Sequence, residues 1–76
     1  MSHLSNIEGR KIVKFVESLG YHFVRQRGSH QRYTNDDGHS VTVSVYKKKC
    51  LAVGVLKDLL RQLGVETNAL LDFLQH

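Results

Sequence analysis

One short segment of the sequence combines side chains that chemistry at a phosphodiester requires. It is the tripeptide Gly28-Ser29-His30, and three arginines surround it: Arg25, Arg27 and Arg32. An imidazole has an unperturbed pKa of about 6.5, so it accepts or donates a proton near neutral pH. RNA carries its own nucleophile, the 2′-hydroxyl, so its cleavage needs a proton-transfer group, a cation beside the phosphate and tight positioning. His30 is therefore the candidate catalytic residue, and the three arginines are candidate RNA-binding residues.

The chain is basic, with a formal net charge of +4, and it carries a second cluster of cations. Lys47, Lys48 and Lys49 follow one another directly. Small basic domains with clustered cations tend to bind polyanions, so this run is a candidate RNA-binding segment. Two hydroxyls and one aromatic ring, which can stack on a base, complete the candidate RNA contacts: Ser29, Ser44 and Tyr46.

Two other interpretations of these residues stay open. A lone exposed histidine is inert in most proteins, and the basic residues would then bind RNA by shape and charge without cleaving it. In the third interpretation, the polar surface around His30 exists only to bind a partner protein. Both alternatives predict that RNA stays intact.

The length of the chain limits it to one domain, residues 1–76. A chain of this size buries roughly 60% of the surface that its unfolded form exposes, which leaves no room for a second core. The single cysteine, Cys50, excludes an internal disulfide, and the acidic residues lack metal-ligand spacing, so we expect neither a metal nor a cofactor. No apolar run is long enough for a membrane span and the N-terminus lacks a signal-peptide pattern, from which we expect a cytoplasmic protein.

The hydrophobic pattern predicts an α+β fold. Apolar residues recur with helical spacing over 9–19 and again over 56–63, and each run ends at a glycine. Between them, alternating patterns predict three short antiparallel strands, one over 21–27 and two within 31–46. A short C-terminal helix is expected over 66–76. The predicted order is helix, three strands, helix and short helix, with the helices packed on one face of the sheet.

The turn between the second and third strands decides which way His30 points. A three-residue loop, Asp36-Asp37-Gly38 with a left-handed glycine, pairs His30 with Ser44. Directly opposed residues point the same way, so this register turns the valines of the third strand toward the helices. The face without helices, here called the open face, then carries five polar side chains: His30, Arg32, Thr42, Ser44 and Tyr46. Gln31 is the exception, because this register turns its amide toward the helices.

These segments resemble a known protein family. The strings GYHFVRQRGSHQRYTNDDGHSVTV and LAVGVLKDLLRQLGV are similar to the HicA mRNA interferases, toxins of bacterial and archaeal toxin–antitoxin pairs. The resemblance covers the chain from Gly9 through the last helix. Its most specific part is Gly28-Ser29-His30, followed by a hairpin and by Gly54, a glycine that opens the next helix. Family members commonly carry Pro and a second His after the third strand, where this chain has Val45-Tyr46-Lys47.

The resemblance implies a fold like that of a double-stranded-RNA-binding domain. It also implies that the strand histidine, here His30, catalyses metal-independent cleavage of RNA, and that a HicB antitoxin is the partner that covers the active site. We therefore expect the toxin of a toxin–antitoxin pair that cleaves mRNA. The alternative function is a double-stranded-RNA-binding module without catalysis.

Overall fold

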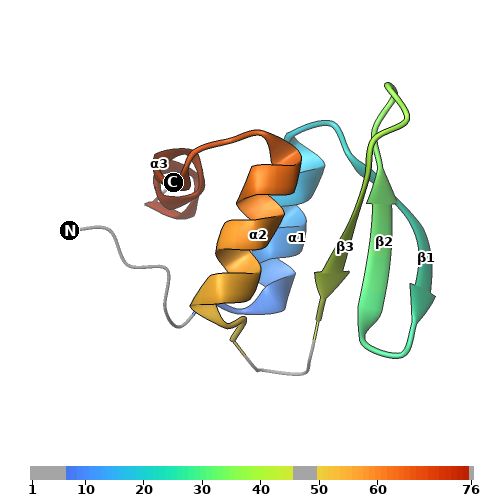
Figure 1. The fold of residues 1–76 in the computed structure, drawn as a ribbon, viewed down its shortest axis with the longest axis horizontal. Helices are drawn as coiled ribbons and strands as arrows, with labels where there is room; N and C mark the ends of the chain where they lie inside the picture. The colour runs from blue at the N-terminus through green and yellow to red at the C-terminus, as the bar shows by residue number, and fades with distance from the viewer. Residues whose placement is uncertain (1–6, 46–49, 76) are drawn as a thin grey trace.

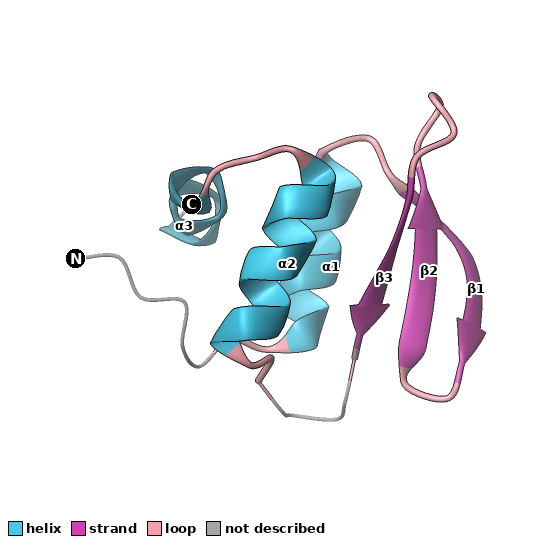
Figure 2. Ribbon diagram, viewed as in Figure 1, coloured by secondary structure: helices cyan, strands magenta, loops and turns pink. Residues whose placement is uncertain are grey.

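The described residues form three helices and three strands in the order α1, β1, β2, β3, α2, α3 (Figures 1 and 2). The computed structural model describes residues 7–45 and 50–75 of the chain. The elements are α1 (Gly9–Ser18), β1 (His22–Arg27), β2 (His30–Thr34), β3 (Ser40–Ser44), α2 (Val53–Leu63) and α3 (Thr67–Gln75). This arrangement confirms the predicted α+β class and the predicted order of elements.

The strands form one antiparallel sheet in the order β1-β2-β3, and the helices lie on one side of it. Both α1 and α2 pack against β3, while α3 lies beyond them, away from the sheet (Figure 1). The rings of Phe15 in α1 and Phe73 in α3 meet with their centroids 5.4 Å apart. The helical layer is therefore centred on β3, and every residue of β1 is exposed.

Each of the two longer helices buries one apolar stripe, and a glycine lies at or just beyond its C-terminal cap. In α1 the stripe is Ile12, Phe15 and Val16, and in α2 it is Leu56, Leu59 and Leu60. Gly64 ends α2 in the left-handed conformation, with a φ of 72°, as the pattern predicts. Leu19, which the helical spacing assigns to the first stripe, is 37% exposed, because α1 ends at Ser18 and Leu19 caps it.

The hairpin between β2 and β3 has the predicted register. Its three-residue loop is closed by a hydrogen bond from the Asn35 N–H to the His39 carbonyl, at 2.9 Å, and Gly38 is left-handed with a φ of 86°. The Asn35 side-chain oxygen accepts two further backbone N–H groups of the loop, which stabilises the turn. His30 pairs with Ser44 as a result.

Strand β1 contains one irregularity that strict alternation does not predict. Phe23 pairs with Tyr33, but the next pair is Arg25 with Arg32, so Val24 is the extra residue of a β-bulge. Without the bulge, Phe23 and both arginines of β1 would point to the same side of the sheet. The bulge leaves Phe23 on the helix side with Tyr33 and turns the arginines to the opposite side, with Arg32.

The entries to α1 and α2 are joined by a short antiparallel bridge. Glu8 and Cys50 are its paired residues, and the Leu51 N–H donates to the Ile7 carbonyl at 3.0 Å. Ile7 and Leu51 are both buried, so the bridge extends the core beneath the starts of the two helices. Within the described segments, no helix combines the length and the apolar character needed to cross a bilayer.

Candidate active site

The open face is polar at each of the paired positions that the structure describes. Cross-strand pairing places three side chains in each of three rows across β1, β2 and β3. The rows are Arg27–His30–Ser44, Arg25–Arg32–Thr42 and His22–Thr34–Ser40. All nine side chains are exposed or half-buried, and the last row is joined by a hydroxyl–hydroxyl hydrogen bond of 2.8 Å between Thr34 and Ser40.

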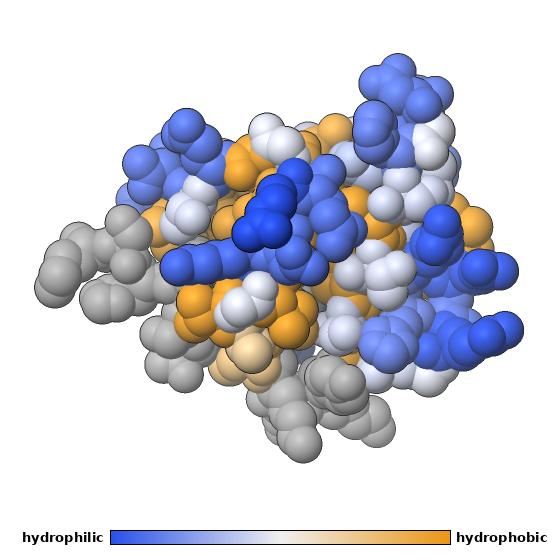
Figure 3. Space-filling model, in the orientation of Figure 1, coloured by the Kyte–Doolittle hydropathy of each residue, from blue (hydrophilic) through white to orange (hydrophobic). Residues whose placement is uncertain are grey.

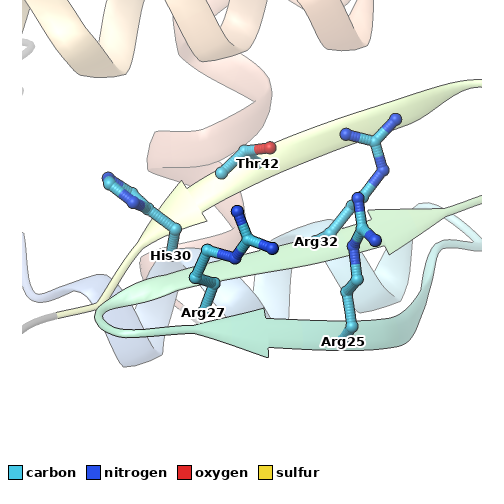
Figure 4. A pocket seen from close by; sticks show the side chains of 5 residues that line it. All are labelled: Arg25, Arg27, His30, Arg32 and Thr42. Carbon is cyan, nitrogen blue, oxygen red and sulfur yellow. The ribbon is translucent and has the colours of Figure 1, made fainter.

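Five of these side chains line a hollow of about 130 Å³, here called the arginine hollow: Arg25, Arg27, His30, Arg32 and Thr42. Figure 4 shows all five rising from the same side of the sheet, with Arg27 beside His30 at one end and Arg25 beside Arg32 at the other. Hydrophilic side chains gather over the sheet end of the molecule (Figure 3). The first two rows of the open face therefore form one continuous polar site.

Hydrogen bonds fix the backbone of the turn that precedes His30. It follows a two-residue turn in which Gly28 is left-handed, with a φ of 59°. The Ser29 carbonyl accepts the Val45 N–H at 2.7 Å, and the Gly28 carbonyl accepts the Gln26 side-chain amide at 2.8 Å. Because both carbonyls of the turn accept hydrogen bonds, the backbone of His30 is held in place at the edge of the hollow that its side chain lines.

The arginine hollow is strongly positive. Within the described ranges, salt bridges join only Arg10 to Glu8 and Arg61 to Asp58, so no carboxylate pairs with an arginine of the hollow. The segments outside those ranges contain no Asp or Glu in the sequence. No group of three or more His, Cys, Asp or Glu that could hold a metal ion occurs in residues 7–45 and 50–75. The hollow is thus suited to an anion.

The structure brings together some of the predicted site residues and separates others. His30 and the three arginines meet in the hollow, and Ser44 lies on the same face opposite His30. Ser29 lies in the turn, half-buried. The other candidates, Tyr46 and Lys47 to Lys49, lie outside the described residues. Thr42 was expected on the open face but not as an RNA contact, and it lines the hollow because it is paired with Arg32.

The three glycines singled out from the sequence have different structural roles. Gly28 and Gly38 both adopt positive φ, which L-residues with side chains rarely do, so each is required by its turn. Gly54 is the second residue of α2, with no positive φ, and a Cβ there would meet nothing within 4 Å. Neither strain nor lack of space explains the glycine at position 54.

A comparison with known families matches residues 9–65 to the family described as HicA toxin of bacterial toxin-antitoxin. The match extends from the first residue of α1 to just past α2 and includes every residue of the arginine hollow. The comparison with curated proteins finds no match. Because the family match spans most of the chain, the chain belongs to the HicA family of toxins from bacterial toxin–antitoxin systems.

Proposed function

We propose that this toxin is a metal-independent endoribonuclease that cleaves mRNA in the cytoplasm, with His30 as its proton-transfer residue. The observation that carries the proposal is the arginine hollow, in which one exposed imidazole and three guanidinium groups line the same cavity. Guanidinium groups bind phosphate oxygens through paired hydrogen bonds, and an imidazole exchanges protons near neutral pH. Together they are the groups that cleavage next to a 2′-hydroxyl requires.

The mechanism follows from this arrangement. A phosphodiester binds over the row of His30 and Arg27, and the imidazole of His30 takes the proton from the ribose 2′-hydroxyl. The 2′-oxygen then attacks the phosphorus and forms a 2′,3′-cyclic phosphate, while the bond to the 5′-oxygen breaks. The leaving 5′-oxygen takes a proton from water, because the hollow is open to solvent, and the hydroxide so formed takes back the proton that His30 gained. The Arg27 guanidinium, beside His30 in the register, stabilises the negative charge that grows on the phosphate oxygens.

Metal independence is part of the proposal because of the side chains that line the hollow. Divalent ions such as Mg²⁺ prefer carboxylate and carbonyl oxygens, whereas the described lining consists of three arginines, a histidine and a threonine. A cation would be repelled there. Cleavage should therefore proceed unchanged in the presence of a chelator.

Replacing the imidazole tests the proposed role of His30. His30→Ala should lower the cleavage rate by about 10²–10⁴-fold, the usual contribution of a positioned acid or base. Its melting temperature should stay the same, because the side chain is exposed and pairs with the neighbouring strands only through its backbone. The measurement is cleavage of a single-stranded RNA in chelator, with detection of the 2′,3′-cyclic phosphate end.

His39→Ala is the matched control, because His39 is an exposed histidine in the β2–β3 turn, outside the hollow. It should cleave like the wild type. A substrate with a 2′-deoxyribose at the cleaved position should resist cleavage by both the wild type and His39→Ala. Equal cleavage by His30→Ala and His39→Ala would contradict the proposal. In cells, induced expression of the wild type should arrest growth, and expression of His30→Ala should not.

One observation favours the alternative of a binding module without catalysis. Among the described residues that line the hollow, His30 is the only histidine, and this lining therefore offers no second imidazole to protonate the leaving group. Such a module would bind duplex RNA with an affinity that falls steeply with salt, and would leave RNA intact after long incubation. Failure to bind any nucleic acid at low salt would favour a pure protein-interaction role instead.

Membership in a toxin–antitoxin family implies an antitoxin partner. We propose that this partner is a HicB-like protein that covers the open face. The exposure and positive charge of the hollow support this, because a protein seated there would exclude RNA from His30. A purified complex with such a partner should fail to retard an RNA that the free toxin retards in a gel.

A further inference from the structure

The register of β1 and β2 brings two arginines directly opposite each other. Arg25 pairs with Arg32, and in the neighbouring row Arg27 pairs with His30. Like charges directly opposite one another on adjacent strands destabilise a sheet. The free protein therefore holds a concentration of positive charge that works against its own folding, and the β-bulge at Val24 is what places both arginines of β1 in it.

The described part of the chain supplies no counter-charge to Arg25 and Arg32. Neither residue takes part in a salt bridge with a described carboxylate, and both are exposed. Glu17 lies on α1, on the other side of the sheet, while Asp36 and Asp37 lie in the turn beyond the third row of the open face. The charge of this pair is therefore available to an anionic ligand, and two guanidinium groups side by side suit the oxygens of one phosphate.

The two rows of the hollow are separated by a distance that fits two phosphates of one RNA strand. His30 and Arg32 are two residues apart on β2, which corresponds to about 7 Å along a strand. Successive phosphates of an extended single strand have a comparable spacing. We propose that Arg25 and Arg32 together bind the phosphate next to the one that is cleaved, so that a single RNA strand lies across both rows.

This inference rests on the proposed function only in taking the anion to be RNA. The row of Arg27 and His30 holds the phosphate that is cleaved, and the row of Arg25, Arg32 and Thr42 holds its neighbour. The Thr42 hydroxyl lines the hollow beside Arg32 and adds a hydrogen-bond donor to the second row. Arg25 and Arg32 are then positioning residues, which fix the register of the strand relative to His30.

Salt dependence of binding tests the second phosphate site without any cleavage. The probe is a short single-stranded RNA with 2′-O-methyl groups, which has no free 2′-hydroxyl to react. For a single strand, each phosphate contact contributes about 0.7 to the slope of log K against log salt concentration. Arg25→Gln and Arg32→Gln should each reduce the slope, and the double variant should reduce it by about 0.7, because both residues hold one phosphate.

Arg61→Gln is the matched control, because it removes an exposed arginine on α2 that pairs with Asp58 instead of lining the hollow. Its slope should equal that of the wild type. An unchanged slope in the double variant would overturn the inference. A loss of about 1.4, twice the loss for one contact, would also overturn it, because the two arginines would then hold separate phosphates.

Thermal melting gives a second test that needs no RNA. In chloride buffer, Arg25→Gln should melt at a higher temperature than the wild type, because the repulsion with Arg32 is relieved. Inorganic phosphate should raise the melting temperature of the wild type more than that of Arg25→Gln. Phosphate stabilises proteins in general by exclusion from their surface, so the difference between the two proteins is the quantity to measure. An equal response of both would contradict the second phosphate site.

These tests separate this inference from the proposed function. If the slope falls in the double variant but RNA is never cleaved, the phosphate site stands and the nuclease proposal fails. If RNA is cleaved in a His30-dependent way but the slope is unchanged, the nuclease stands and the phosphate site fails.

Discussion

The orientation of His30 depends on two side chains that lie on the other side of β2. Gln31 faces the helix side, where an unpaired amide would be costly. The buried Tyr33 also faces that side, and its hydroxyl donates to the Gln31 side-chain oxygen at 2.7 Å. Because neighbouring residues of a strand point to opposite faces, holding Gln31 and Tyr33 on one side keeps His30 and Arg32 on the other.

Removing the tyrosine hydroxyl should weaken the fold. Tyr33→Phe leaves the Gln31 amide oxygen, half-buried, without its donor, and it should lower the free energy of unfolding by about 1 kcal/mol at neutral pH. The measurement is denaturant unfolding. In a Gln31→Leu background, Tyr33→Phe should lower the free energy of unfolding much less, because the hydrogen bond is already absent.

The stabilities of the wild type and of Tyr33→Phe should respond differently to alkaline pH. Burial, and to a smaller extent the charge of Glu17, raises the pKa of Tyr33 above its ordinary value of about 10. As pH rises past 10, the unfolded chain loses this proton before the folded one does, so the stability of the wild type falls. The difference in the free energy of unfolding between wild type and Tyr33→Phe should therefore become smaller above about pH 10. A gap that stays constant or widens would contradict this account.

At the scale of the element, β1 marks the limit of what alternation predicts. The valines of β3 and the glycine of the turn were sufficient to predict the β2–β3 register, and with it the exposure of His30. The arginines of β1 share sequence parity with Phe23, so strict alternation turns them toward the helices. That conflict between charge and parity is a signal for a bulge, but it does not say which residue is the extra one. The structure identifies Val24.

Two deletions in β1 test whether Val24 is the extra residue that sets the face of the arginines. Without it, Phe23 and Arg25 become neighbours on a regular strand, so Phe23 still pairs with Tyr33 and Arg25 still pairs with Arg32. RNA affinity should stay within about threefold of the wild type, since no phosphate contact is lost. Deleting Gln26 instead reverses the face of Arg25 relative to Arg27, and RNA binding should weaken. Equal effects of the two deletions would argue against this role of the bulge.

At the scale of the molecule, the helical layer comes close to the end of β3 where α1 begins. A Cβ on Gly9 would lie 2.9 Å from the Ser44 carbonyl oxygen and 3.1 Å from the Val45 Cα, both of them backbone atoms. Ser44 ends β3 in the row of His30, and Val45 donates to the turn before His30. The lack of a side chain at Gly9 therefore allows the helical layer to approach the strand end that supports the site.

Two alanine substitutions should act in opposite directions. Alanine has an advantage over glycine of up to about 1 kcal/mol inside a helix. At Gly9 a clash with backbone, which costs about 1–3 kcal/mol, outweighs that advantage, so Gly9→Ala should lower the melting temperature. At Gly54 the space is open, so Gly54→Ala should raise it. A rise in the melting temperature of Gly9→Ala would contradict the close approach at Gly9, and a fall for Gly54→Ala would contradict the open space at Gly54.

The bulge in β1 also bears on how copies of the toxin behave toward one another. β1 is an edge strand, exposed along its whole length, and its apolar side chains Phe23 and Val24 are about half exposed. A regular, straight edge strand is a template on which another chain can add a strand. The extra residue interrupts the regular spacing of the outward N–H and C=O groups, and the flanking arginines repel a second copy. Deleting Val24 would therefore leave the affinity for RNA in place and make the protein more prone to aggregate.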